Sequence, residues 1–207
     1  MPHSIPTVYR GVQMRSRLEA KWAAFFDQLG WRWQYEPTEF PGWIPDFALF
    51  GRKGNVVYVE VKPVGHFPSE VAGELNHAMR DEDKSIELLI LGLMPNFTYD
   101  TGGRSRATVS NSPPLGWLYE TYGTNITPPE CSWMGETWGG WVDADFHVLG
   151  GWGFHSVIGE WFNRITGSYD GTRGAWVVQK KQFPDHLAAL QIFWNRACNS
   201  QQWRSVL

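Results

Sequence analysis

Residues 41–63, PGWIPDFALFGRKGNVVYVEVKP, contain two apolar runs joined by a short polar connection. Their β-branched and aromatic content predicts two strands, over 46–50 and 56–62, and so short a connection predicts that they pair as a hairpin. Two carboxylates and an amine interrupt these runs: Asp46, Glu60 and Lys62. Charged side chains are rarely buried in a sheet, so their presence here indicates a function rather than packing.

The two carboxylates predict a metal site. Alternate residues of a strand share a face, so Glu60 and Lys62 point the same way, about 7 Å apart along the strand. Strand pairing can bring Asp46 beside Glu60. Neighbouring carboxylates repel each other unless a cation lies between them, and hard oxygen ligands select magnesium or manganese. Such a cation would disfavour the ammonium form of Lys62, which could then orient or deprotonate a water that attacks a phosphorus atom.

The periodicity of apolar residues predicts the elements around this hairpin. Helical spacing covers residues 16–29, and alternation of aromatic and polar residues over 31–37 favours a strand. Residues 68–84 again have helical spacing, and 86–95 form a short apolar run typical of a buried strand. The order helix, three strands, helix, strand predicts an α/β core of about 100 residues, with helices packed against a mixed sheet.

The segments RSRLEAKW, IPDF and VEVKP, in this order, resemble the motifs of the PD-(D/E)XK nuclease superfamily, which includes restriction enzymes and junction resolvases. The resemblance covers roughly residues 15–92, and the details YEP, PDF and EVKP are most similar to small phage- or bacterium-encoded members. It implies a restriction-endonuclease-like α-β-β-β-α-β core. It also implies catalytic and metal-binding residues: Asp46, Glu60, Lys62, Glu19 on the first helix, and the backbone carbonyl of Val61 completing the metal shell.

By this resemblance the chain is a metal-dependent deoxyribonuclease that uses Mg²⁺, with Mn²⁺ as a substitute. It implies DNA as the partner, an endonuclease acting in phage or bacterial DNA processing, repair or recombination, and allows a homodimer. The motifs ExK and PD are each common by chance. Their order, their strand-compatible interval and a glutamate on an upstream helix make the combination more specific than either part.

Two glutamates near these motifs have more than one interpretation. Ser16 and Glu19 also fit a capping box, in which the glutamate returns a hydrogen bond to the backbone at the helix start. The metal and capping roles of Glu19 both remain open. Glu36 could lie near the site, but a solvent-facing strand position is favoured.

Several basic residues are candidates for phosphate contacts. Arg15 and Arg17 flank the start of the first helix, where the helix dipole also favours anions, and Lys21 follows one turn later. Arginines at helix starts are more often simply solvated. His77 and Arg80 lie on the second predicted helix, where a surface position is favoured for both.

The composition changes after Pro95. A polar, Gly- and Pro-rich stretch follows, which predicts a division into a nuclease-like core over 1–95 and a Trp/Gly-rich region over 96–207 that packs on it. Within the second region, 176–182 could form a strand, and 184–203 is typical of a closing helix. Its tryptophans could stack on bases or sugar rings, but burial is the commoner use of large aromatics.

The segment WVDADFHVL, 141–149, alternates apolar and polar residues. The polar set, Asp143, Asp145 and His147, would share one strand face and could form a second metal site. An amphipathic strand with a solvated face predicts the same pattern and is favoured.

Composition limits the classes of function. The formal net charge of −3 and the pI near 6.1 argue against coating nucleic acid through bulk positive charge, so binding must rest on local patches. The two cysteines lack zinc-ligand spacing, and no apolar run could span a bilayer, so a cytoplasmic protein of a bacterial or phage-infected cell is expected. Two competing classes remain: a non-catalytic protein on the same fold that binds nucleic acid or a partner, and a carbohydrate-binding module.

Overall fold

The chain folds around one large sheet in the computed structural model, which describes residues 4–78, 86–97, 115–122, 138–147, 151–156, 163–168 and 173–200. The helices are α1 (Arg17–Gln28), α2 (Ser69–Ala78) and α3 (Arg173–Ser200). The strands are β1 (Thr7–Tyr9), β2 (Val12–Met14), β3 (Arg32–Tyr35), β4 (Phe47–Phe50), β5 (Val56–Val61), β6 (Glu87–Leu91), β7 (Gly116–Tyr122), β8 (Trp138–His147) and β9 (Gly153–Ser156).

Seven strands form the large sheet in the order β3-β4-β5-β6-β7-β8-β9. All neighbours pair antiparallel except β5 and β6, which pair parallel, and α2 supplies the crossover that a parallel pair requires. The predicted α/β class with a mixed sheet is confirmed, and α1, β3, β4, β5, α2 and β6 follow in the predicted order. The sheet then continues through β7, so the proposed boundary at residue 95 falls between two strands that pair directly.

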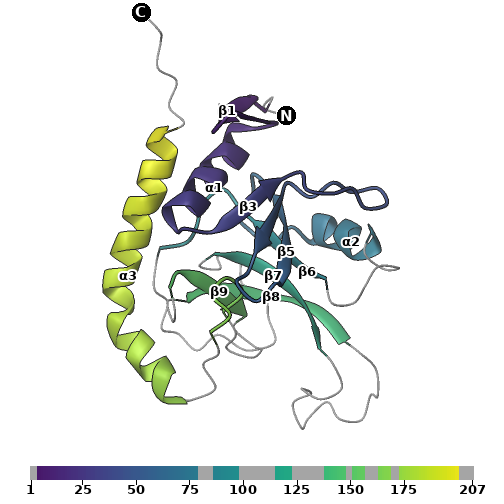
Figure 1. The fold of residues 1–207 in the computed structure, drawn as a ribbon. Coiled ribbons are helices and arrows are strands. Elements are labelled where there is room, and N and C mark those ends of the chain that lie inside the picture. The colour runs from purple at the N-terminus through teal and green to yellow at the C-terminus, as the bar shows by residue number, and fades with distance from the viewer. Residues whose placement is uncertain are drawn as a thin grey trace, which may run out of the picture.

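Helices cover both faces of this sheet. Figure 1 shows α1 beside α3 on one side and α2 on the other. On the first side, Trp22 and Phe25 of α1 are fully buried, and their rings lie 4.8 and 5.4 Å from that of Trp194 in α3. On the second side, Leu75 of α2 packs with Ile90 and other buried residues of the sheet. Burial of these apolar faces is the main stabilising contribution to the fold.

A β-hairpin that the sequence analysis missed precedes α1. Strands β1 and β2 pair antiparallel, with Tyr9 opposite Val12. Arg10 and Gly11 between them have φ values of 49° and 80°, the left-handed values of a type I′ turn. That turn normally favours Asn-Gly or Asp-Gly, so Arg-Gly gave only a weak signal.

The prediction of a strand over 176–182 is wrong, because α3 already begins at Arg173 and passes through Pro184. A strand needs a neighbour to satisfy its backbone hydrogen bonds, whereas a helix satisfies them within itself, and this segment continues directly into a helix packed on α1. Although α3 has 28 residues, neither it nor any other helix of the described ranges is long and apolar enough to cross a membrane.

The solvated face predicted for 141–149 is also wrong. Asp143 and His147 are only 1% and 0% exposed, although β8 was expected to have a solvated face. Asn163 places its Nδ2 3.2 Å from Nδ1 of His147. His155 lies opposite Asp145 on β9, and its ring is 5.1 Å from that of His147. Asp143, His147, His155 and Asn163 are therefore buried polar residues.

Burial is confirmed for part of the tryptophan set. Trp117 is 2% exposed, and Trp141 and Trp152 are half-buried. Trp133 and Trp161 lie outside the described residues. Of the tryptophans whose side chains the structure describes, none is fully exposed, and an array of exposed tryptophans is what a carbohydrate-binding surface would require.

Replacing Phe26 with alanine is expected to lower the free energy of unfolding by about 3–5 kcal/mol, because this 0%-exposed ring leaves a cavity against Phe47 and Trp31. Ile192→Ala is the control: its side chain is 50% exposed, and it should change stability by no more than about 0.5 kcal/mol. Urea unfolding of both variants measures the difference. Equal effects would contradict the assigned core.

Candidate functional site

Asp46 and Glu60 meet at one end of the sheet. In the antiparallel pair of β4 and β5, Phe47 lies opposite Val59, so Asp46 and Glu60, one position further along each strand, are also opposite each other. The predicted hairpin therefore brings the two carboxylates together, as the sequence indicated. Both are nearly inaccessible to solvent, with side chains 4% and 9% exposed.

Asp46 has two partners. Its Oδ2 accepts a hydrogen bond of 2.7 Å from the backbone N–H of Val61, and its Oδ1 lies 2.6 Å from Nη2 of Arg15. Desolvation and the neighbouring charge of Glu60 nevertheless raise the pKa of Asp46 to about 7, since they outweigh the bond from Val61 and the Arg15 cation. The site is thus short of positive charge at Asp46.

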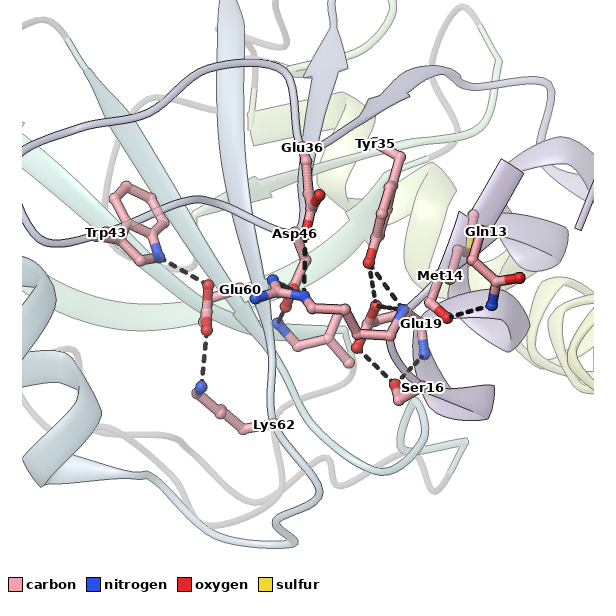
Figure 2. A network of polar contacts seen from close by, with 12 residues as sticks. Gln13, Met14, Ser16, Glu19, Tyr35, Glu36, Trp43, Asp46, Glu60 and Lys62 are labelled. Carbon is pink, nitrogen blue, oxygen red and sulfur yellow. Dashed lines mark hydrogen bonds and ion pairs between the residues drawn. The ribbon is translucent and has the colours of Figure 1, made fainter. Parts of the chain in front are cut away.

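Glu60 is held between a tryptophan and a lysine, as Figure 2 shows. Nε1 of Trp43 donates to Oε2 at 2.7 Å, and Nζ of Lys62 lies 2.7 Å from Oε1. Lys62 is 35% exposed at its side chain, so it bridges the buried carboxylate and the solvent. The predicted proximity of the amine to the carboxylates is therefore present in the structure.

A tight turn delivers Trp43 to this position. Phe40 and Trp43 exchange backbone hydrogen bonds of 2.8 and 3.1 Å across Pro41 and Gly42. Proline followed by a glycine at φ 77° is typical of a type II turn. The Trp43 ring stacks on that of Phe40 at 5.4 Å, and Phe40 packs edge-on against Tyr58 of β5, which fixes the indole over the strand that carries Glu60.

Glu19 caps α1. Ser16 is the N-cap: its Oγ accepts from the backbone N–H of Glu19 at 3.1 Å and donates to Oε1 at 2.6 Å. Oε2 accepts from the N–H of Arg15 at 3.1 Å and from the hydroxyl of Tyr35 at 2.7 Å. The capping interpretation is confirmed, with the return bond going to Arg15 rather than Ser16. The Glu19 charge also contributes to raising the pKa of Asp46, so this residue lies close to the pair.

Arg15 is the cation that reaches Asp46. Besides that contact, its Nε lies 3.0 Å from Oε1 of Glu36. Glu36 is exposed, as favoured above, but it does not lie in a strand: β3 ends at Tyr35, and Glu36 has a left-handed φ of 42°. The cluster therefore contains four carboxylates and the two cations of Arg15 and Lys62, which gives it a formal charge of −2. The carboxylates are those of Glu19, Glu36, Asp46 and Glu60.

The other basic candidates lie elsewhere. Lys21 faces α3, where its charge lowers the pKa of the Cys198 thiol against a larger increase caused by burial. Arg17 is half-buried in the first turn of α1, and His77 is exposed on α2, as favoured above. Arg80 lies outside the described residues. Nucleic-acid contacts by Arg17 and Lys21 stay predictions.

Two oxygen-bearing side chains, Asp46 and Glu60, are the residues best placed to hold a divalent cation. No group of three or more His, Cys, Asp or Glu side chains suited to a metal occurs within the described part of the chain. Mg²⁺ nevertheless usually retains several waters and binds through one or two carboxylates. The raised pKa of Asp46 and the formal charge of −2 fit a cation there, whereas the carboxylate of Glu19 already accepts three hydrogen bonds at the start of α1. Val61 contributes its N–H to Asp46, and its carbonyl stays a predicted ligand.

Comparison of the chain with models of protein families, with curated proteins and with solved structures gave no match in any of the three. The interpretation of the site therefore rests on its own chemistry.

Sequence reasoning missed Tyr35 and Trp43. Both lie in segments that had been assigned another significance: Tyr35 is the tyrosine of the motif YEP, and Trp43 lies within residues 41–63. Their pattern predicted strand and turn structure. Only the close approach of these segments to Glu19 and Glu60 gives the side chains their roles.

Replacing Asp46 with asparagine is expected to stabilise the protein above neutral pH. The pKa of Asp46 is about 7 in the folded state and 3.8 in the reference state, so the folded state binds more protons between these values. The free energy of unfolding of the wild type should therefore fall as the pH rises from about 4 to 7. Asparagine cannot ionise, so the variant Asp46→Asn does not lose this stability. Near pH 8 its free energy of unfolding should exceed that of the wild type by roughly 2–4 kcal/mol, since one pKa unit corresponds to about 1.36 kcal/mol.

Thermal unfolding between about pH 4 and pH 8 measures this difference. Glu39→Gln, which neutralises an exposed carboxylate of the β3–β4 loop, is the matched control and should follow the wild-type profile. A variant Asp46→Asn that is less stable than the wild type at the alkaline end would contradict the desolvation argument.

Proposed function

We propose that this protein is a metal-dependent nuclease that hydrolyses phosphodiester bonds in DNA. The observation that carries the proposal is the pair of buried, opposed carboxylates, Asp46 and Glu60, with the amine of Lys62 2.7 Å from one of them. Stability does not favour a buried like-charge pair, since each carboxylate loses hydration and repels the other. A bound divalent cation would offset this repulsion, which accounts for the pairing of the two carboxylates.

In this proposal Asp46 and Glu60 hold Mg²⁺, with Mn²⁺ as a substitute, and the carbonyl of Val61 completes the protein ligands. When bound, the metal supplies Lewis acidity toward a phosphate oxygen and lowers the pKa of its water. Lys62, partly exposed at the rim, orients or deprotonates the attacking water. Trp43 fixes the rotamer of Glu60, and Tyr35 and Ser16 fix that of Glu19, so both acids are preorganised.

Arg15 acts as a substitute cation in this proposal. Its guanidinium neutralises Asp46 in the absence of metal, and its exposed side chain can turn outward when a divalent ion binds. In that outward position it would contact the phosphate backbone. The finer assignments follow from the same hypothesis: a restriction-endonuclease-like core topology, endonucleolytic cleavage, and a role in phage or bacterial DNA processing, repair or recombination.

A second candidate function is a non-catalytic nucleic-acid- or partner-binding protein on this fold. The observation in its favour is that every carboxylate of the cluster has a protein partner, so the network is closed by Arg15, Lys62 and Trp43 without a metal. Cleavage and metal binding discriminate between the two candidates.

Lys62→Ala is expected to lower DNA cleavage by about 10²–10⁴-fold, the usual contribution of a group that transfers or orients a proton. Supercoiled, linear and branched DNA are incubated with Mg²⁺, with Mn²⁺ or with EDTA. Arg196→Gln, which removes an exposed charge on α3, is the control and should cleave like the wild type. Absence of cleavage by the folded wild type with either metal would refute the nuclease proposal in favour of the second candidate.

Mn²⁺ is expected to raise the melting temperature of the wild type and not that of an Asp46→Asn, Glu60→Gln double variant. A ligand present at about 100 times its Kd stabilises the folded state by roughly 2.7 kcal/mol. Na⁺ and K⁺ at matched ionic strength serve as controls for general salt effects. An equal shift in both proteins would place the metal elsewhere and contradict the role of the carboxylate pair.

A further inference from the structure

An open groove of about 640 Å³ runs between the β1–β2 hairpin, the end of α1 and the strand β3. It is lined by Arg10, Val12, Asp27, Trp31, Arg32, Trp33, Gln34 and Tyr35. Of these residues, Tyr35 is hydrogen-bonded to the carboxylate cluster described above. The proposed cleavage site therefore leaves most of the groove unexplained.

The groove follows the free edge of the sheet. It contacts five consecutive residues, 31–35, whereas residues on one face of a strand would contribute only every second position. Strand β3 is the last strand of the described sheet on this side and pairs with β4 alone. Backbone N–H and C=O groups along that edge have no partner strand in the described sheet and can bond to an extended ligand.

The charged groups of the groove favour an anionic ligand. The lining holds two arginines, Arg10 and Arg32, and one aspartate, Asp27, which gives a formal charge of +1. Nη2 of Arg32 donates to the carbonyl of Gly51 at 3.2 Å. Asp27 is already neutralised within the wall: it accepts from the hydroxyl of Tyr9 at 2.7 Å and from Nε1 of Trp33 at 3.1 Å, and it lies 3.0 Å from Nη1 of Arg10. The side chain of Arg10 remains 67% exposed, so its guanidinium can contact a further anion.

Aromatic side chains lie beside these charges. Trp33 and Tyr35 are half-buried on β3, and Trp33 stacks on Tyr9 of the hairpin at 6.4 Å. Half-buried rings next to arginines are the combination with which proteins bind unpaired nucleotides, because the rings stack on bases while the cations contact phosphates.

The groove is continuous with the carboxylate site through Tyr35. The residue lines the groove, and its hydroxyl donates to Glu19 and accepts from the N–H of Arg15, the residue that contacts Asp46. Figure 2 shows Tyr35 extending from its strand to Glu19, on the opposite side of Asp46 from Trp43. A chain lying along β3 would therefore lead from Arg32 toward Asp46.

We infer that this groove binds a single-stranded segment of nucleic acid and guides it to the carboxylate site. The inference deepens the proposed nuclease function and rests on it for the direction of the strand. Arg10 and Arg32 contact phosphates, the backbone edge of β3 adds hydrogen bonds, and Trp33 and Tyr35 stack on bases. An extended peptide or a second copy of the chain could also pair with the edge, but neither explains the exposed arginines or the continuity with Asp46.

The test is binding of fluorescein-labelled oligo(dT) in EDTA, followed by fluorescence anisotropy, so that affinity is measured without cleavage. Arg10→Asn with Arg32→Gln removes both charges, and asparagine suits the left-handed φ of 49° at position 10. We expect Kd to rise about tenfold or more. The slope of log affinity against log salt should also fall by about 1.4, at ~0.7 per phosphate contact of a single strand.

Gln34→Glu is a second variant that leaves the hairpin intact. Its side chain is exposed in the groove, so the added negative charge should weaken binding without affecting folding. Arg196→Gln, an exposed charge on α3 outside the groove, is the matched control and should bind like the wild type. Wild-type affinity in both folded groove variants would overturn the inference.

The result is separable from that of the cleavage experiment. Weakened oligo(dT) binding in the groove variants supports the inference even if the wild type cuts no DNA with either metal, and then only the nuclease proposal fails. If the wild type does not bind oligo(dT), the inference is overturned. It is also overturned if Gln34→Glu instead dissociates a wild-type dimer in gel filtration, because the edge then pairs with a second copy.

Discussion

Two carboxylates buried opposite each other at the end of a sheet must be compensated by their surroundings, and the local structure around Asp46 and Glu60 meets part of that requirement. Each contribution comes from a different segment. The junction of hairpin and helix provides Arg15, the loop between β3 and β4 provides Trp43, and the end of β5 provides the N–H of Val61 and the amine of Lys62. The raised pKa of Asp46 indicates that the compensation is incomplete. An additional cation would complete it.

Such a site lowers the stability of the fold, and the core has to offset it. Helix α1 contributes residues to both the carboxylate site and the hydrophobic core. Its first turn is fixed by the capping bonds of Ser16 and Glu19 beside the carboxylates, and its following turns bury Trp22, Phe25 and Phe26 against the sheet and α3. The same helix thus joins the site to the hydrophobic core. Stability that is given up at a site in return for function is a common property of proteins.

Strand β3 connects the two surfaces on which function is proposed. Its free edge faces the groove, and its last residue, Tyr35, reaches the carboxylate cluster. Burial and the hydrogen bond to Glu19 raise the pKa of the Tyr35 phenol, so it stays a donor over the whole neutral range. Edge strands of natural proteins are usually covered or blunted. An edge that lies open beside two arginines and a half-buried tryptophan is consistent with a ligand that covers it only part of the time.

The sequence alone determined the α/β class, the order of the elements from α1 to β6, and the meeting of Asp46, Glu60 and Lys62. These follow from local rules: helical and strand periodicity, and a hairpin whose short connection brings its two strands side by side. The sequence also left both roles of Glu19 open, and the bonds from Ser16 and Tyr35 confirm the capping role.

The remaining features were decided by contacts between segments far apart in the chain. The pattern at Asp143 and His147 is the same for a solvated strand and a covered one, and tertiary contacts such as that of Asn163 with His147 decide that it is buried. The region 176–182 has strand-like composition, but without a neighbouring strand it joins α3. Trp43 and Arg15 gained their roles because folding places them against Glu60 and Asp46. Such contacts leave no periodic signal in a sequence, because each side chain meets its partner only after the sheet and the helices have packed.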